Sequence, residues 1–163
     1  MSGYMDRLQR YKENRGVMAS LRCILVESKT HRAWSMLSRL GIGIDDPAWS
    51  WVAGLFATHP ETASVGNFGA TCRAIMVSRD EKPGDDNKMT PTERRFQHLL
   101  AAEQGKEVRD RVLRMVLLAK AQGVPVNYEK LATDLKCWND HTKTEWAKAF
   151  WGQGESVENK GAA

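Results

Sequence analysis

Cysteine is scarce in this sequence, and the few cysteines present form no pattern. The 163 residues contain three of them, far apart along the chain, at positions 23, 72 and 137. An odd number without any C-x-x-C pair favours neither a disulfide framework nor a zinc site. The four histidines likewise lack a two-ligand spacing such as H-x-x-x-H. We therefore expect no metal, no cofactor, and three thiols that are packed or partly packed within helices.

Long apolar runs are missing as well. No stretch approaches the roughly 20 apolar residues that span a bilayer, and the polar N-terminus lacks the apolar segment of a signal peptide. The content of 42% hydrophobic and 27% charged residues is ordinary for a soluble globular protein. These features predict a cytoplasmic protein that makes no use of a membrane.

Alternation of apolar and polar residues, which is typical of half-buried strands, is not sustained anywhere in the chain. Apolar residues recur instead at helical spacing. The sequence therefore predicts an all-α fold, a helical bundle made of two small helical subdomains. Helical segments are expected over residues 4–14, 17–28, 33–40, 47–59, 66–78, 91–100, 107–121 and 127–138.

The stretch 90–138 carries the clearest pattern. Thr90 and Glu93 have the spacing of a capping box, with Pro91 at the first helical position. Apolar residues then recur at helical spacing in two further segments, the second of them capped by Asn127. Three helices are therefore expected to share one core. A second apolar strip predicts that the middle helix packs on two sides, at Leu113 and Leu117.

Residues 80–89 have the composition of a loop, because they are rich in Asp, Lys, Pro and Gly. We expect this loop to be the seam between an N-terminal subdomain, 1–80, and a C-terminal subdomain, 90–152. The tail 153–163 has one apolar side chain larger than alanine and is expected to be disordered.

Catalytic patterns are not found in the sequence. The pair Asp45-Asp46 is better explained as a helix cap, and Asp85-Asp86 as loop solvation, than as a nuclease metal site. Glycine pairs lack the preceding strand or following Lys-Ser/Thr of a phosphate-binding loop. We therefore expect a protein that is not an enzyme.

Six short runs carry a family resemblance. Three lie in the C-terminal half, from Glu93 to Leu100, Val124 to Leu135 and Glu145 to Gly152. Three N-terminal runs follow the same family's order, from Ala19 to Arg22, Leu55 to Pro60 and Ser64 to Gly66. Together they resemble the CasB family, the small subunit of Cascade, the type I-E CRISPR surveillance complex. The resemblance covers roughly residues 15–152. Two features depart from it, namely Cys23, where members often carry a second arginine, and a long polar loop after Arg79.

The resemblance implies a non-enzymatic, sequence-nonspecific nucleic-acid-binding subunit in antiviral defence. Family members are described as lying in two copies along the complex, touching its backbone and large subunits with their CRISPR RNA. They hold the target and displaced strands of the R-loop, so the implied ligands are single- and double-stranded DNA. Such a subunit needs only positive charge on a rigid face, because base pairing with the guide reads the sequence. The residues leave open an alternative, a helical protein-protein adaptor whose basic patches bind acidic partners.

Positive charge is distributed unevenly along the chain. The net charge is +4 overall, +5 over residues 1–44, −3 over 45–89 and +3 over 90–120. Two basic regions of this kind fit a surface that faces a polyanion. The candidate nucleic-acid-binding residues are Arg22, Arg94, Arg95, Arg109, Arg111, Arg114 and Lys120. Lys106 flanks those of the segment 90–120.

Two of these assignments depend on which way a side chain points. Arg111 and Arg114 are expected to face outward, because burial of an unpaired guanidinium is costly. Arg22 borders the apolar stripe of its helix, so it either extends the DNA-binding track or pairs with Glu27 or another acid. Among the six tryptophans, we expect a core position for Trp34, Trp49, Trp138 and Trp146, and leave open Trp51 and Trp151.

Overall fold

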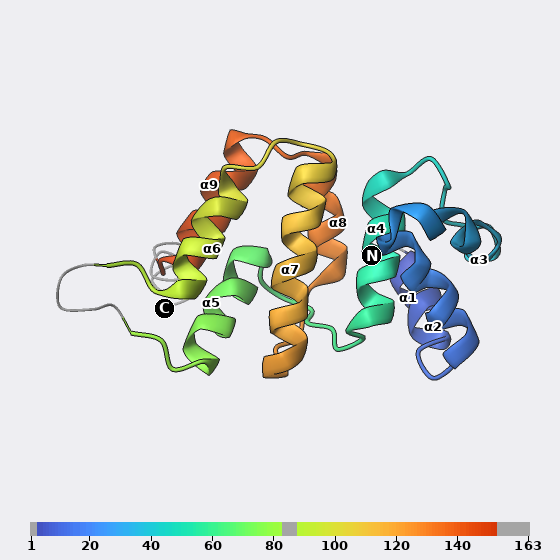
Figure 1. Cartoon of the computed structure of the whole chain (residues 1–163), viewed down its shortest axis with the longest axis horizontal. Coiled ribbons are helices and arrows are strands. Elements are labelled where there is room, and N and C mark those ends of the chain that lie inside the picture. Colours follow the sequence, from blue (N-terminus) through green and yellow to red (C-terminus); the bar gives the residue numbers. More distant parts are fainter. Residues whose placement is uncertain (1–2, 83–87, 153–163) are drawn as a thin grey trace.

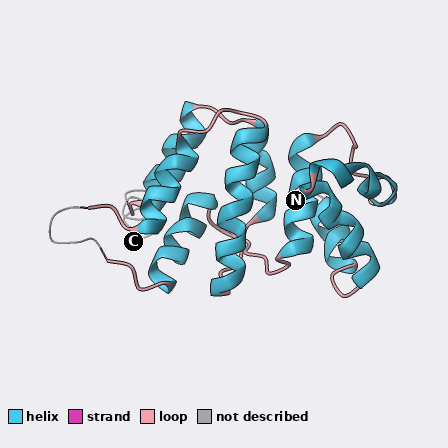
Figure 2. Cartoon of the chain, in the orientation of Figure 1, coloured by secondary structure: helices cyan, strands magenta, loops and turns pink. Residues whose placement is uncertain are grey.

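The computed structural model describes residues 3–82 and 88–152, and within this part of the chain the fold is an all-α bundle (Figure 2). The predicted fold class is confirmed. The one strand-like contact among these residues is an isolated bridge between Thr62 and Val126. The helices of the first half are α1 (Gly3–Arg10), α2 (Arg15–Arg22), the 3-10 helices η1 (Cys23–Leu25) and η2 (Glu27–Ala33), α3 (Trp34–Arg39) and α4 (Pro47–Thr58). Those of the second half are α5 (Phe68–Ser78), α6 (Pro91–Leu100), α7 (Lys106–Gln122), α8 (Tyr128–Lys136) and α9 (Asp140–Phe150).

Most helices begin where a side chain satisfies their free amide groups. Asp46 accepts a hydrogen bond from the amide of Trp49 and starts α4, and Asn127 does the same for α8. The capping box of Thr90 and Glu93 is present at α6, as predicted. The helix expected over 17–28 ends at Arg22 instead, where the chain tightens into the 3-10 helices η1 and η2.

The helices fall into two groups that meet at α4, α7 and α8 (Figure 1). Figure 1 shows α1 to α4 on one side and α5 to α9 on the other. Because α5 packs against α6, α7 and α9, it lies with the C-terminal helices. The division into two subdomains stays a prediction, and this packing favours a boundary within 59–67 over the expected seam at 80–89. The expected disordered tail, 153–163, lies outside the described residues.

Buried polar contacts join the two groups. The hydroxyl of Tyr128 donates to the carbonyls of His59, at 2.6 Å, and Leu55, at 3.3 Å. Burial, helped by the negative charge of Glu61, raises the pKa of Tyr128, so the hydroxyl keeps its proton and remains a donor. A ring nitrogen of His59 lies 2.6 Å from the carbonyl oxygen of Val124. The end of α4 is therefore bonded to the segment between α7 and α8.

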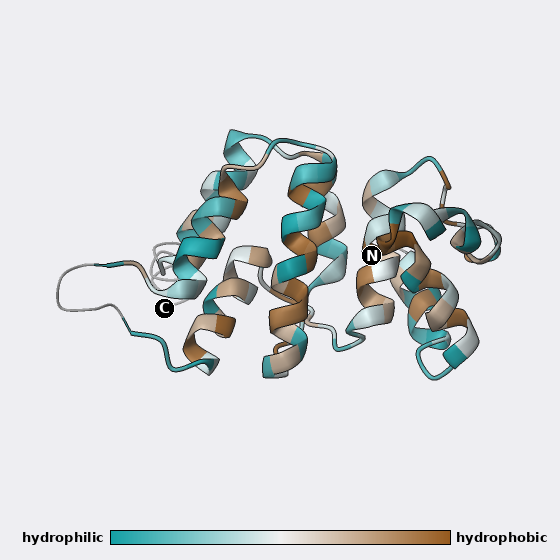
Figure 3. Cartoon of the chain, in the orientation of Figure 1, coloured by the Kyte–Doolittle hydropathy of each residue, from teal (hydrophilic) through white to brown (hydrophobic). Residues whose placement is uncertain are grey.

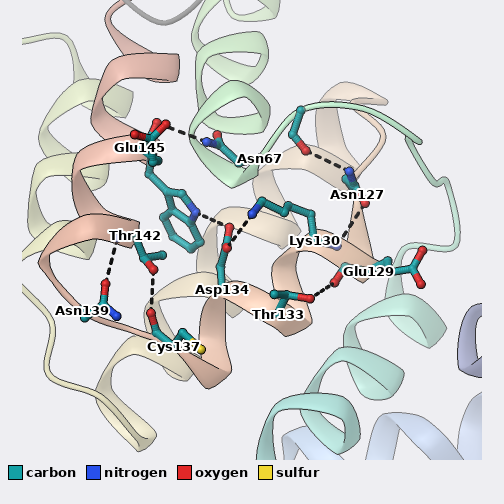
Figure 4. A network of polar contacts seen from close by, with 12 residues as sticks. Asn67, Asn127, Glu129, Lys130, Thr133, Asp134, Cys137, Asn139, Thr142 and Glu145 are labelled. Atoms are coloured by element: carbon teal, nitrogen blue, oxygen red, sulfur yellow. Dashed lines mark hydrogen bonds and ion pairs between the residues drawn. The ribbon is translucent and has the colours of Figure 1, made fainter. Parts of the chain in front are cut away.

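A second polar network holds α5, α8 and α9 together (Figure 4). Asp134 on α8 accepts a hydrogen bond from the indole of Trp146, at 2.7 Å, and pairs with Lys130 at 3.1 Å. The side-chain amide of Asn67 donates to the carbonyl of Glu145. At Gly69 a Cβ atom would lie 2.0 Å from the carbonyl oxygen of Trp146, so α5 crosses α9 at a distance that only glycine permits.

The predicted core is confirmed at most positions. The predicted apolar stripe of α7 is buried, and so are Trp49, Trp138 and Trp146. The stripe consists of Val108, Val112, Met115, Val116 and Ala119, and Figure 3 shows apolar and polar residues alternating along this helix. Two predictions for apolar side chains are wrong. Leu117 is 47% exposed, so α7 does not pack along the whole of its second strip. Trp34 is 44% exposed, because the neighbouring Ala33 takes the buried position where η2 meets α3.

The three cysteines are free, as expected, but they differ in burial. Cys72 is buried, and burial raises the pKa of its thiol. Cys23 is partly buried, whereas Cys137 is exposed. The prediction of a packed thiol is wrong for Cys137, since this residue lies beyond the last turn of α8 as its C-cap.

Glu81 links the end of α5 to the start of α6. Its carboxylate accepts hydrogen bonds from the amide and hydroxyl of Thr92, at 2.9 and 2.6 Å, and pairs with Arg79 at 2.7 Å. Burial by itself raises the pKa of this carboxyl, but the hydrogen bonds from Thr92 and Thr90 and the charge of Arg79 outweigh burial and lower it.

A lowered pKa makes this contact sensitive to acid. Its stabilisation is complete above the ordinary glutamate pKa, about 4.3, and is lost as the pH falls through the lower pKa of the folded state. We expect Glu81→Gln to reduce the free energy of unfolding at pH 7 and to flatten its decline below pH 5. Urea titrations between pH 7 and pH 3 measure this. The matched change Glu13→Gln, at an exposed glutamate, should alter neither the free energy of unfolding at pH 7 nor its decline below pH 5. If Glu81→Gln and the parent lost stability equally below pH 5, the assignment would be contradicted.

Candidate nucleic-acid interface

A groove runs between α6 and α7, and we call it the α6–α7 groove. It has a volume of about 350 Å³ and is lined by Arg95, His98, Arg111, Arg114, Met115, Leu117 and Leu118. The capping box orients α6, and the buried stripe of α7 fixes the other wall. Two predicted site residues of α7 and one of α6 therefore meet in one concave, basic surface.

Two arginines that line this groove, and a third beside it on α6, are available to a ligand. Arg95 and Arg114 are exposed, and neither guanidinium has an ion pair or hydrogen bond to any other described residue. Arg94 is also exposed on α6, and its one contact is a long hydrogen bond of 3.5 Å to the carbonyl of Met89. Exposed guanidinium groups of this kind are suited to phosphate, because they offer a planar fork of donors.

Arg111 is placed differently from the outward orientation that we predicted. Its side chain is only 20% exposed and pairs with Glu107 at 2.8 Å. It also donates a hydrogen bond to the carbonyl of His98, near the end of α6. Burial is tolerated because the charge is paired, and the contact with His98 joins two helices that the sequence does not place side by side. Arg111 thus fastens α7 to α6 and shapes the groove.

Arg109 and Lys120 lie on the other flank of α7. The guanidinium of Arg109 is 5.8 Å from the ring centre of Trp51 on α4, and the indole of Trp51 donates to the carbonyl of Arg109. Lys120 follows eleven residues later, which returns to nearly the same angle on a helix of 3.6 residues per turn. Lys106, on the same helix, pairs with Glu27 at 3.3 Å. The structure does not bring these residues into the α6–α7 groove.

Arg22 ends α2 and contacts α4. Its guanidinium donates to the carbonyl of Ala57, in the last turn of α4, at 3.1 Å. A cation is favourable there because the C-terminal end of a helix carries partial negative charge. The expected alternative partner, Glu27, pairs with Lys106 instead. Arg22 thus joins two N-terminal helices, away from the α6–α7 groove.

We expect Arg22→Met to lower the free energy of unfolding by about 1 kcal/mol, the typical contribution of one such hydrogen bond. Urea denaturation measures the change. Arg15→Met removes an exposed arginine of the same helix that has no side-chain partner among the described residues, and should change little. Unchanged stability of Arg22→Met, together with weaker binding of single-stranded DNA, would instead return Arg22 to the binding track.

Other kinds of site find no support in the described residues. Over 3–82 and 88–152, no three His, Cys, Asp or Glu side chains gather so that they would hold a metal ion. In the same ranges no helix has the length and apolar character needed to cross a bilayer.

Comparison with known proteins decides the family. The model of the family described as CRISPR-associated protein Cse2 matches residues 17–151. The chain belongs to the Cse2 (CasB) family. The family resemblance that the sequence motifs indicated, over roughly residues 15–152, is thereby confirmed.

Solved structures share the Cse2 fold at low sequence identity. CasB from M. ruber is 22% identical, with a TM-score of 0.65, and the match covers 96% of this chain and 97% of that one. A CRISPR-associated protein of the Cse2 family from Thermus thermophilus is 18% identical, with a TM-score of 0.71 and coverage of 91% and 96%. A chain of a CRISPR RNA-guided surveillance complex is 20% identical, with a TM-score of 0.73 and coverage of 98% and 95%. No curated protein matches the sequence.

Proposed function

We propose that this Cse2-family protein is a non-enzymatic small subunit of a CRISPR surveillance complex and binds nucleic-acid backbone at the α6–α7 groove. The observation that carries the proposal is the set of exposed guanidinium groups that have no acidic partner among the described residues: Arg95 and Arg114 in the groove, and Arg94 beside it on α6. Phosphate contacts of this kind supply affinity and position without reading sequence.

The groove is rigid, which lowers the entropic cost of binding. The stripe of α7 beneath it is buried, and Arg111 ties its wall to the carbonyl of His98 and to Glu107. The guanidinium groups therefore project from helices that are already fixed. A strand that docks there loses its own freedom but orders little of the protein.

The family and the fold support the proposed assembly. A chain of similar fold, with a TM-score of 0.73, comes from a CRISPR RNA-guided surveillance complex. In such a complex this protein would lie against the backbone and large subunits, with a second copy of itself, and hold the target and displaced strands of the R-loop. The guide would read the sequence, so a sequence-nonspecific contact suffices. The proposed setting is the cytoplasm.

The salt dependence of single-stranded DNA binding tests this proposal. If Z phosphates are neutralised, the logarithm of the affinity falls linearly with the logarithm of salt concentration, with a slope of about −0.7Z for single strands. We expect a slope near −2 from three arginines, for strands of any sequence, at about −0.7 per contact. If the protein is instead an adaptor that binds only acidic proteins, it should not bind DNA. Absence of DNA binding would therefore overturn the proposal.

A further inference from the structure

Trp34 differs from the other tryptophans. It is 44% exposed at the start of α3, and its indole N–H donates to no acceptor among the described residues. Trp49 is buried. The remaining indoles each donate to a protein oxygen, namely those of Trp51, Trp138, Trp146 and Trp151. The ring of Trp34 therefore offers both an exposed π-face and a free N–H donor to a ligand.

The 3-10 geometry of η2 places cations beside this ring. With three residues per turn, residues i and i+3 lie above one another, so the helix has three rows. The inner row contains the buried Ala33, and a second row contains His31 and Trp34. Their ring centres are 6.3 Å apart and their planes are inclined by 76°, so each ring offers its own face to a separate base. The third row contains Lys29 and Arg32, both exposed. An aromatic row and a cationic row therefore run side by side.

The charge of this surface is not compensated. Residues 28–44 contain no Asp or Glu. The side chains of Lys29, Arg32 and Arg39 are exposed and make no ion pair or hydrogen bond with another described residue. The acid that precedes the segment, Glu27, pairs with Lys106. The surface is thus complementary to a polyanion.

We propose that Trp34 and His31 form a stacking platform for unpaired bases of a single-stranded nucleic acid, and that Lys29 and Arg32 neutralise its flanking phosphates. Aromatic rings interleaved with cations bind single strands because every base has a π-face. This inference rests on the proposed function and adds a second contact, on η2 and α3. Figure 1 places α3 at the end of the molecule remote from α6.

Binding of the full chain to three probes tests the platform. The probes are an oligothymidine strand, an abasic strand of the same length, and a duplex. Trp34→Ala should bind oligothymidine roughly 5- to 150-fold more weakly, the range for loss of one stacked base, and should bind the abasic strand and the duplex like the parent. Its salt slope should not change, because no charge is removed. Trp34→Phe should recover part of the affinity.

Matched variants keep the test specific. Tyr11→Ala removes another N-terminal aromatic that is 40% exposed, and should leave binding of all three probes unchanged. Trp34→Leu, which keeps apolar bulk but has no π-face, repeats the test if the alanine variant melts at a lower temperature.

Three results would overturn the platform. In the first, Trp34→Ala and Trp34→Leu bind oligothymidine like the parent while substitution of Arg94, Arg95 and Arg114 weakens it, so the proposed function stands and the platform fails. In the second, the loss is equal on the abasic strand, so no base is stacked. In the third, DNA affinity is unchanged but the variant fails to join the other subunits of the complex, so the face contacts protein. If the parent binds no strand at all, the proposed function fails as well.

Discussion

Replacement of Trp146 by alanine is expected to lower the free energy of unfolding by about 3 to 5 kcal/mol, the usual cost of removing a large buried aromatic. The residue is fully buried, and its ring lies against those of Phe68 and Trp138, with centroid distances of 5.3 and 4.8 Å. The substitution also leaves the buried Asp134 without the indole donor at 2.7 Å. Because small domains are stable by about 5 to 15 kcal/mol, this variant should fold poorly. Thermal and urea denaturation measure the loss.

Two controls separate packing from hydrogen bonding and from binding. Trp146→Phe keeps most of the ring but removes the donor to Asp134, so it should cost less than alanine. Trp151→Ala removes a tryptophan that is 40% exposed but donates to Glu93 and contacts the ring of Phe150, so it should cost clearly less than Trp146→Ala. A Trp146→Ala protein that folds like the parent yet loses nucleic-acid binding would place this ring on a binding surface, against the core assignment.

Removal of two charges from the α6–α7 groove and a third from beside it, at Arg94, is expected to have the largest effect on binding. The triple variant Arg94→Gln, Arg95→Gln, Arg114→Gln should flatten the salt slope for single-stranded DNA by about 2 units, at about 0.7 per lost contact. The loss of affinity should be similar for all sequences, since phosphates carry no sequence information. The melting temperature should be nearly unchanged, because these side chains are exposed.

A matched triple variant controls for net charge. Arg10→Gln, Lys12→Gln, Arg15→Gln removes the same charge from exposed positions on and between α1 and α2. It lowers the long-range attraction equally but leaves the groove intact, so its salt slope should stay close to that of the parent. Equal slopes for the two triple variants would show that net charge, and not the groove, determines binding.

Local features of the fold were predictable because they depend on neighbouring residues. The caps at Asp46, Thr90 and Asn127 and the end of α7 at Gly123 each follow from a side chain or a backbone angle within one turn. The buried stripe of α7 follows from helical period alone. The family followed from six such local runs in a characteristic order.

Features that depend on distant residues were missed. Arg111 was expected in solvent, but its partners include the carbonyl of His98 on another helix. Arg109 was grouped with the groove residues, although it faces Trp51 on α4. In both cases the sequence shows the angle of a side chain on its own helix, and not which helix packs against that side.

Trp34 was missed for a different reason. The apolar stripe was assigned on a period of 3.6 residues, whereas the chain enters α3 from a 3-10 helix with three residues per turn. The change in period moves the buried position to Ala33. The change from a 3-10 helix to an α-helix thus exposes Trp34, whose indole, unlike that of the exposed Trp151, donates to no other described residue.

The most direct test of the central claim, that the α6–α7 groove holds nucleic-acid backbone in the assembled complex, is site-directed photo-crosslinking. Phosphorothioates carrying a photoreactive group are placed along the target and displaced strands, the complex is assembled with its guide RNA, and crosslinked peptides of this subunit are identified by mass spectrometry. We expect crosslinks to peptides from α6 and α7, around residues 94–98 and 111–118, and their loss in the triple arginine variant. Crosslinks confined to other surfaces of the subunit, or none to this subunit at any position, would contradict the account.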